Sequence, residues 1–440
     1  MKPDKKYNAN HAANFQGIGL VIQQMLRLDV PDLFDSYLGK RPKQSTYKNS
    51  DIFLGWIYAN LCGAQRLQDI ETENIKASFD KIPVAKLCSP DQISRVFRSF
   101  GTEVNRFKNP DSQIEHEFNR NPLLNDLLLS LCKRLGLLNT NSKYMIDYDG
   151  TTIPAEKFDC KHTYKGFLGY SPAVSMIGKI PVNIEARNGN TSASYKIKEA
   201  LEDLFTRLDN HQIKTWAIRM DAASYQKEII YYLQKIGKKF FIRVHNTEEM
   251  KDDFKIAFWQ TVELHGRTEE ISSVEFYPFN DNNKFRFVVS RYNKSIQSNE
   301  IEYQYRGIIT NHFEKIPGTV NYEMSDLDVI AIYDQRGDSE NNFRDLLNDF
   351  NWSRVPFSDM NANLVFLYVS AMAKCIYEYT LEQLSTYTPF IRDNYRLKIF
   401  IARFIKPVML HWEKSPNGWK VDLMNLHDTF AGLRRWITRE

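Results

Sequence analysis

Cysteine and histidine are sparse in this chain, and neither forms a metal-binding pattern. The five cysteines are an odd number and include no CxxC pair. Both facts argue against a disulfide framework and against a zinc ribbon. The nine histidines form no HxxxH or HExxH pair, so a zinc site has little support. A reducing cytoplasm is the simplest expectation for the location of the protein.

Long apolar runs are also missing. The run "LVFLYVSAMA", which begins at Leu364, is too short to cross a bilayer and predicts a buried helix. The N-terminal sequence MKPDKKYNANHAANF has no apolar segment of the kind that signal peptides contain. We therefore expect no membrane partner.

Excess charge is the third feature that this chain lacks. Its net charge is only +4 over 440 residues. A charge this small steers nucleic acid weakly, so a nucleic-acid partner requires basic residues that are grouped locally. Hydrophobic residues make up 42% of the chain, which fits a folded protein of more than one domain.

Helical patterns dominate residues 15–140, where apolar residues recur at spacings of three and four. One short helix is predicted in "SPDQISRVFRSFG", with Ser89 as its N-cap and Pro90 at its first position. The apolar side of this helix leaves Arg95 and Arg98 outside. It is either a short DNA-recognition helix or the solvated face of a helical bundle.

The pattern changes to alternating strands and helices at Lys143. Strands are predicted in "KYMIDYDG", "AVSMIG", "IPVNIEAR", "TWAIRMD" and "KKFFIRV", with helices before and after the fourth. The order is therefore β, β, β, α, β, α, β. Residues 246–326 are rich in Phe, Tyr, Val and turn signals, which predicts a β-rich insertion. After it, "LDVIAIY" predicts a strand and "SENNFRDLLNDF" a helix.

Acidic residues stand where these predicted strands end. In "YMIDYDGTT", Asp147 and Asp149 are two residues apart, so both point to one face of a strand. Asp221 ends an apolar strand and precedes a helix, a place where ligands bind in α/β sheets. Asp221 is either a helix cap or a functional acid. Because Ser224 offers another cap, we favour function.

Glu340 lies at the edge of the apolar stripe of its predicted helix. At about 100° per residue, Phe343, Leu346 and Phe350 fall to one side of it. Such a position lets Glu340 reach over the sheet on which the helix packs. Three carboxylates gathered from separate segments need cations to neutralise them, and hard divalent metals prefer oxygen ligands. Two such ions would suit phosphoryl transfer, with Mg²⁺ the first choice.

Together these features resemble the DDE transposases of bacterial insertion sequences, which have a ribonuclease-H-like core. In that family the first Asp lies on the first strand, the second follows the fourth strand, and the Glu lies on a later helix. Asp149, Asp221 and Glu340 match these places. Tyr333, Arg336 and Glu340 also match the signature Tyr-x2-Arg-x3-Glu. With "DYDGT" and "RNGNTSAS", the chain is similar to insertion-sequence family 1380, within the group typified by family 4.

The resemblance implies a multidomain α/β fold: a helical N-terminal domain, a ribonuclease-H-like mixed-sheet core interrupted by a β-rich insertion, and a helical C-terminal region. The expected divisions are a helical DNA-binding domain at 1–140, the first part of the core at 141–245, the β-rich insertion at 246–326, the second part of the core with the Glu-bearing helix at 327–390, and a basic region at 391–440.

The resemblance also implies an activity and its parts. Asp149, Asp221 and Glu340 are expected to bind two Mg²⁺ ions, for which Mn²⁺ could substitute. Tyr333 and Arg336 are expected to hold phosphates near the cleaved end. The substrate is double-stranded DNA, namely the terminal inverted repeats and a target, and the expected assembly is a synaptic homodimer. The reaction is endonucleolytic strand cleavage followed by strand transfer, in the nucleoid of a bacterial cytoplasm.

Two positions depart from this pattern or leave it open. The signature of the group continues with a Lys that would fall at 347, where this chain has Leu347. Arg344 could supply a similar positive charge from the other side of the helix, although its fork differs from an ammonium. Either the DNA contact is rearranged, or the protein is a catalytically impaired, transposase-derived DNA-binding protein. Asp149 is preferred over Asp147 as the metal ligand because Gly150 and Thr151 follow it; Asp147 then supports the site from behind or is an ordinary strand-end acid.

A phosphatase is the chemical alternative. "YMIDYDGTT" fits the DxDGT motif of haloacid-dehalogenase-type phosphatases, in which Asp147 would be the nucleophile, Asp149 the general acid and Asp338 a magnesium ligand. Against it, two predicted strands follow the motif before any helix, and Glu340, Arg336 and Tyr333 would have no role. The transposase interpretation is therefore preferred.

Overall fold

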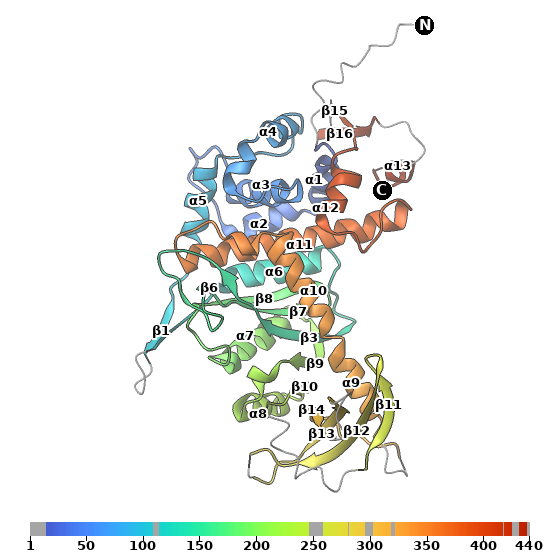
Figure 1. Cartoon of the computed structure of the whole chain (residues 1–440). Helices are drawn as coiled ribbons and strands as arrows, with labels where there is room; N and C mark the ends of the chain where they lie inside the picture. Colours follow the sequence, from blue (N-terminus) through green and yellow to red (C-terminus); the bar gives the residue numbers. More distant parts are fainter. Residues whose placement is uncertain are drawn as a thin grey trace.

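One mixed β-sheet runs through the molecule, with most of the helices gathered around its upper part (Figure 1). The structure is a computed structural model. It describes residues 15–108, 114–245, 258–279, 281–294, 302–317, 322–416, 418–424 and 431–437. From one edge of the sheet to the other, the strands are β1 (Asn105–Lys108), β2 (Glu115–Arg120), β8 (Ile180–Arg187), β7 (Ala173–Ile177), β3 (Lys143–Gly150), β9 (Lys214–Met220), β10 (Lys239–Arg243), β14 (Tyr303–Thr310), β13 (Phe285–Asn293), β12 (Arg267–Phe276) and β11 (Gln260–Leu264).

The centre of the sheet consists of the five core strands predicted from the sequence. β3, β7 and β8 follow one another as antiparallel neighbours, and β9 and β10 lie parallel to β3 on its other side. Helix α7 (Ile197–Asn210) connects β8 to β9, and helix α8 (Lys227–Lys235) connects β9 to β10. All residues of β7 and β8 are buried, as expected of strands covered on both faces. The predicted α/β class with a mixed-sheet core is confirmed.

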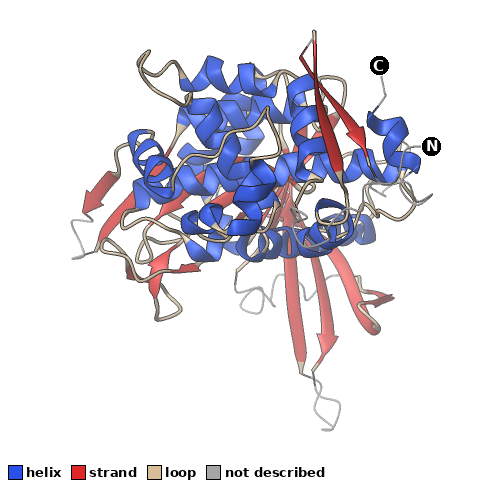
Figure 2. Ribbon diagram, turned by 90° about the horizontal axis from the view of Figure 1, so that it is seen from above, coloured by secondary structure: helices blue, strands red, loops and turns tan. Residues whose placement is uncertain are grey.

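The β-rich insertion extends the core sheet rather than forming a sheet of its own. β14 pairs antiparallel with β10, with Phe241 opposite Thr310, and β13, β12 and β11 follow outward in turn. Figure 2 shows long strands that project away from the helical body. Edge pairing satisfies the backbone groups that β10 would otherwise expose.

The segment "LDVIAIY" was expected to be a strand, and this expectation is wrong. Residues 326–334 form helix α9 (Asp326–Asp334). Its N-terminus has a capping box, in which Ser325 Oγ accepts from the Asp328 backbone N–H at 3.1 Å and the Asp328 carboxylate accepts from the Ser325 backbone N–H at 2.9 Å. Val329, Ile330 and Tyr333 then recur at helical spacing and pack onto β10, β12, β13 and β14. The sequence S-x-x-D was the signal for this helix.

The N-terminal part is mainly helical, as expected, but it also supplies two strands. β1 and β2 lie within the predicted helical region 15–140 and extend the sheet beyond β8. The helices of this part are α1 (Ile18–Arg27), α2 (Val30–Leu38), α3 (Asn49–Leu61), η2 (Leu67–Glu71), α4 (Glu73–Phe79), α5 (Pro90–Ser99) and α6 (Pro122–Arg134).

The predicted buried helix around Leu364 is the central helix of the fold, α11 (Met360–Tyr387). It packs against α3, α5, α6 and β8. It is the single helix among the described residues with the length and hydropathy of a membrane span, and 89% of its apolar window is buried inside the protein. Its apolar residues are therefore those of a core helix.

The C-terminal part folds back onto the N-terminal helices. The Gly17 backbone N–H donates to the Ile405 carbonyl at 3.0 Å, and Arg27 Nη2 donates to the Ile437 carbonyl at 2.6 Å. The predicted hairpin at "SPNGW" is present. The elements are α12 (Leu397–Phe400), the π-helix η6 (Ile401–Ile405), β15 (Leu410–Ser415), β16 (Gly418–Leu423) and α13 (Ala431–Ile437).

One histidine joins the insertion to α9. His265 lies in the turn between β11 and β12, with Nδ1 at 3.0 Å from Glu269 Oε1 and Nε2 at 2.8 Å from Asp334 Oδ2. Asp334 is the last residue of α9. The hydrogen bond to Glu269, followed by that to Asp334, raises the pKa of His265 above its usual 6.5.

The His265 contacts predict a pH-dependent stability. Because the folded-state pKa is raised, the stabilisation is fully present below pH 6.5 and is lost as the pH rises through the folded-state pKa. His265 is well exposed, so the effect should be at most about 1 kcal/mol. Urea unfolding at a series of pH values should show this difference between wild type and His265→Ala. A His411→Ala control, at an exposed position on β15, should behave as wild type. If the stability difference between wild type and His265→Ala does not fall as the pH rises, the assignment is contradicted.

Candidate active site

Two acids lie next to each other at the ends of two parallel core strands. β3 and β9 run parallel with Tyr148 opposite Met220, so Asp149 and Asp221 are the next residues in the same register. Neighbouring strands are about 4.8 Å apart. The twisted sheet therefore brings together two carboxylates that are distant in the sequence, as predicted.

The Asp149 carboxylate is paired with an arginine from the helical segment above it. Arg336 Nη2 lies 2.6 Å from Asp149 Oδ2, and the two side chains are 15% and 14% exposed. The other oxygen, Oδ1, accepts from the Gly150 backbone N–H at 2.9 Å. Both oxygens of the Asp149 carboxylate thus have a partner within the protein.

Asp221 caps a single 3-10 turn, η3 (Ala222–Ser224). Its Oδ1 accepts from the Ala223 backbone N–H at 3.1 Å, so the residue is a cap after all. No partner of Oδ2 is found in the described part of the chain. One carboxylate oxygen of Asp221 therefore serves the backbone and the other is available to a ligand.

Asp221 lies where two cavities meet. The larger, of about 910 Å³, is called the Asp221 cavity, and Tyr333, Arg336 and Arg243 also line it. The smaller, of about 200 Å³, is called the side cavity; it is lined by Gly150 and Thr151 on the Asp149 side.

Tyr333 and Arg336 reach the site from α9 and its C-terminal end. Tyr333 is 9% exposed, and its hydroxyl donates to the Met220 carbonyl at 3.4 Å. Burial raises the pKa of Tyr333. Burial on its own lowers the pKa of Arg336, but Asp149, Tyr333 and Asp221 outweigh it, and the pKa is raised. Arg336 Nε is buried without a hydrogen-bond partner among the described atoms, so one donor beside the two acids is unused.

Glu340 lies on the helix that follows. The backbone of Glu340 belongs to α10 (Gly337–Asn348), while its side chain and that of Asp338 lie outside the described residues. Phe343, Leu346 and Phe350 are buried, which agrees with the predicted apolar side of this helix.

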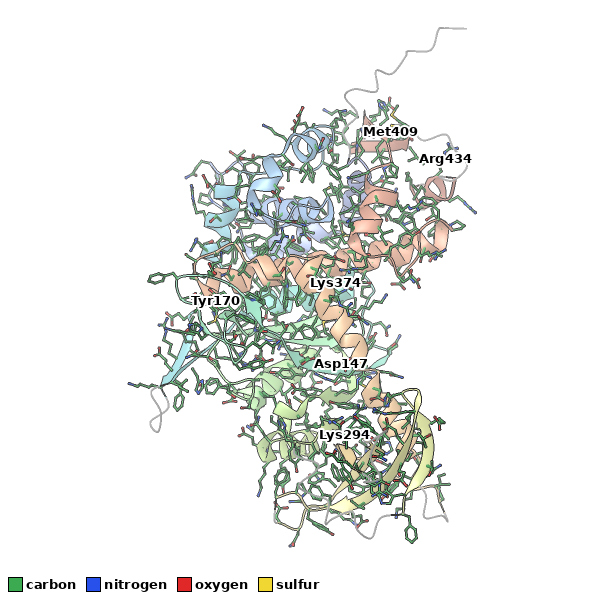
Figure 3. The ribbon with its side chains drawn as sticks, in the orientation of Figure 1. Asp147, Tyr170, Lys294, Lys374, Met409 and Arg434 are labelled. Atoms are coloured by element: carbon green, nitrogen blue, oxygen red, sulfur yellow. The ribbon has the colours of Figure 1, made fainter. Side chains whose placement is uncertain are left out.

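A buried lysine of α11 joins this helix to α10. Lys374 of α11, labelled in Figure 3, is fully buried and lies 2.7 Å from Glu378 and 3.7 Å from Asp345 of α10. Burial of a lysine is tolerated when carboxylates surround it. This network sets the position of α10 above the sheet.

Asp147 has a structural role. Its two oxygens lie 2.5 and 2.7 Å from Nε and Nη2 of Arg219, directly across on β9, and it is 3% exposed. Arg219 Nη1 also donates to the Ile332 carbonyl of α9 at 2.6 Å. Asp147 therefore supports the site from behind, one of the two roles left open for it (Figure 3). A buried acid in a bidentate ion pair is not placed to act as the nucleophile that the phosphatase alternative requires.

The remaining predicted contacts lie away from the two acids. Arg344 is exposed, donates to Asn341 at 2.7 Å, and lines a different cavity. Leu347 is partly buried against the core, so an apolar residue at this position contributes to packing. Arg95 is exposed on α5, whereas Arg98 is paired with Asp359 at 2.5 Å and lies 5.2 Å from the Phe357 ring. Arg98 thus joins α5 to the start of α11.

Two residues of the site, Arg219 and Arg243, were not predicted from the sequence. Arg219 is the partner of Asp147, and its signal was an arginine inside the apolar strand "AIRMD". Arg243 ends β10 and lines the Asp221 cavity; burial lowers its pKa. The sequence signal for Arg243 is the same as for Asp221, because both are charged residues at the end of a parallel strand.

The two acids suit a divalent metal. Hard cations such as Mg²⁺ prefer carboxylate oxygens and need only one or two from the protein. Asp149 and Asp221 carry such oxygens at the ends of neighbouring strands, with Arg336 bound to one oxygen of Asp149. Among the described side chains, no group of three or more His, Cys, Asp or Glu residues gathers.

The chain is a multidomain α/β protein with a large mixed sheet, in which acids stand at the ends of β3 and β9 and Arg336 pairs with one of them. A family model described as "Transposase DDE domain group 1" matches residues 22–389. The chain therefore belongs to this family of transposases.

Two further comparisons were made. No curated protein matches the chain. One solved structure with a detectable likeness is a cryo-EM structure of the piggyBac transposase synaptic complex with hairpin DNA. It is 10% identical, with a TM-score of 0.41, and the match covers 90% of this chain and 80% of that chain. The family assignment rests on the family model.

The two neighbouring acids of β3 should respond differently to mutation. Asp147→Ala leaves Arg219 buried and unpaired, so the free energy of unfolding should fall by about 3–5 kcal/mol. Asp149→Ala should lower it by less, because the Arg336 and Asp149 side chains are 15% and 14% exposed, against 10% and 4% for Arg219 and Asp147. Urea unfolding measures both.

The double variant Asp147→Leu with Arg219→Met is the matched control for this comparison. It removes both charges and should recover much of the stability that Asp147→Ala loses. Equal stability losses in Asp147→Ala and Asp149→Ala would contradict the distinction between a structural and a functional acid.

Proposed function

We propose that this protein is a DNA transposase of an insertion sequence of bacterial family 1380. It binds the terminal inverted repeats of its element, cleaves a DNA strand at each end, and joins the freed 3′ hydroxyl to a phosphodiester of the target. The observation that carries the proposal is the Asp149–Asp221 pair at the ends of β3 and β9, with Arg336 against it.

Asp149, Asp221 and Glu340 would hold two Mg²⁺ ions, or Mn²⁺ in their place. When bound, such ions supply an activated attacking oxygen and stabilise the leaving oxygen of a phosphodiester. The contribution of the chain is to hold the carboxylates at a defined spacing. The parallel register of β3 and β9 supports this role for the first two, and the anchoring of α10 through Lys374 supports it for Glu340.

Arg336 and Tyr333 would bind the DNA backbone beside the cut. Arg336 is already held at the acids, and its unused Nε is a donor for a phosphate oxygen. Arg243 adds a second positive charge to the Asp221 cavity. Tyr333 fixes the end of α9 against β9 through Met220, so that Arg336 enters the cavity at a set position.

The helical N-terminal part would recognise the inverted repeats. α5 presents the exposed Arg95, while Arg98 holds this helix against α11. Base recognition by a short helix and backbone contacts by nearby basic residues are the usual division of labour on duplex DNA. Two such chains, each on one end of the element, would form the synaptic homodimer.

Cleavage of the DNA that flanks the gene tests the proposal. Purified protein with Mg²⁺ should nick duplexes that carry the terminal repeats, and Asp149→Ala, Asp221→Ala and Glu340→Ala should each lower the rate by about a hundredfold or more, equal to roughly 3 kcal/mol of barrier. Glu228→Ala, at an exposed acid of α8, is the matched control and should cleave as wild type. Undiminished cleavage by all three acid variants would refute the assignment.

Metal binding can be followed without any reaction. Saturating Mg²⁺ or Mn²⁺ should raise the Tm of the wild-type protein by about 2–5 °C, because the folded state alone presents both carboxylates together. Asp149→Asn and Asp221→Asn should lose most of this shift, whereas the Glu228→Ala control should keep it. Differential scanning fluorimetry is the measurement, and an equal shift in both Asn variants would exclude these acids as ligands.

A further inference from the structure

A small three-stranded sheet connects the first and second strands of the core. It consists of β4 (Ile153–Pro154), β6 (Leu168–Tyr170) and β5 (Lys161–His162), with β6 in the middle. Tyr170, at the end of β6, marks its position in Figure 3. Two aromatic rings of this small sheet are largely exposed, Phe158 by 97% and Tyr164 by 80%.

The small sheet is held firmly against the core by the residues that follow β8. Asn188 Nδ2 donates to the Asp159 carbonyl at 2.7 Å, and Asn188 Oδ1 accepts from the Lys161 backbone N–H at 2.8 Å. A Cβ at Gly189 would lie 2.2 Å from the Lys161 carbonyl oxygen, so only glycine allows this close approach. The small sheet is therefore a rigid attachment to the core.

Tyr164 sits in a tight turn at the tip of this attachment. The Thr163 backbone N–H donates to the Phe167 carbonyl at 2.8 Å, and the Gly166 backbone N–H donates to the Thr163 carbonyl at 2.9 Å. Gly166 has a φ of +85°, which the turn requires and glycine adopts readily. The backbone thus sets the place of the tyrosine ring while the ring itself stays open to solvent.

The Tyr164 ring borders the active site. It lines both the Asp221 cavity and the side cavity, which share Asp221. Lys165 lines the side cavity as well, with Nζ 5.5 Å from the centre of the Tyr164 ring. His162 and Thr163 continue the rim of the Asp221 cavity. An exposed aromatic face, an ammonium and the Asp221 carboxylate therefore lie around one space.

We propose that Tyr164 is a stacking platform for an unpaired base of the DNA end that is cut, with Lys165 at the adjoining phosphate. The inference rests on the proposed function, because it takes the substrate to be DNA. A phosphodiester at Asp149 and Asp221 places the neighbouring nucleotide within reach of the two cavities. A base that leaves the duplex there needs an aromatic face, and each of the four bases can stack on one.

Other aromatic rings near the site are already used. Tyr333 is buried, and its hydroxyl is bonded to Met220. The guanidinium carbon of Arg291 lies 3.9 Å from the centre of the Trp259 ring, in the insertion. Tyr148 is buried beneath the side cavity and bonded to Glu185. Tyr164 is the ring with an open face among the aromatic side chains that line the two cavities.

The test uses a DNA duplex with a short single-stranded 3′ tail that carries 2-aminopurine as its first unpaired base. Binding in EDTA, which prevents cleavage, should quench the fluorescence of this base when it stacks on Tyr164. Tyr164→Ala should abolish the quenching and weaken binding of the tailed duplex roughly five- to a hundredfold. Tyr164→Phe should retain both.

Phe158→Ala is the matched control. Phe158 is exposed on the same small sheet but lines neither cavity, so its removal should leave quenching and affinity as in wild type. A blunt duplex should bind wild type and Tyr164→Ala equally, which separates base stacking from backbone binding.

Three outcomes would overturn the inference: no quenching by wild type, unchanged quenching by Tyr164→Ala, or an equal loss in Phe158→Ala. The cleavage assay on the flanking repeats reads the proposed function separately. Tyr164-dependent quenching without cleavage would refute the transposase reaction and leave the stacking site standing. Cleavage by the wild type without quenching would refute the stacking site and leave the transposase reaction standing.

Discussion

The ion pair between Asp147 and Arg219 is the interaction on which the active site depends. It joins β3 to β9 in register, and the same guanidinium donates to the Ile332 carbonyl of α9. Three elements from distant parts of the chain are therefore tied at one buried point. A buried charge pair of this kind is costly unless every donor and acceptor is used, and here nearly all are. These contacts hold the ends of β3 and β9 next to the C-terminal end of α9.

The meeting of those elements explains how like charges are tolerated. Asp149 and Asp221 lie at the ends of neighbouring parallel strands, where two like charges repel each other. Arg336 enters from the end of α9 and takes up the charge of Asp149, and Asp221 gives one oxygen to the Ala223 backbone. The insertion supports this arrangement from the far side, because β14 extends the sheet and α9 packs across the strands so formed.

Some elements of the fold were predicted correctly from the sequence and others were not. The first five core strands, their order and the buried helix around Leu364 were predicted correctly, because their apolar periodicity is strong and local. Residues 327–333 were wrongly predicted as a strand, since a run of apolar residues has no clear period and the S-x-x-D cap before it was passed over. β1 and β2 were missed because β1 is short and exposed, and Phe118 is the one apolar residue among the buried residues of β2.

By itself, the sequence determined which acids follow the core strands and that Tyr333 and Arg336 precede the Glu-bearing helix, because strand period and motif spacing are properties of neighbouring residues. Only the tertiary structure decided that Asp147 is buried in an ion pair, because its partner Arg219 lies across the sheet. It also decided that the insertion continues the core sheet and that Tyr164 stands beside Asp221. Such pairings join residues far apart in the chain, and no local pattern records them.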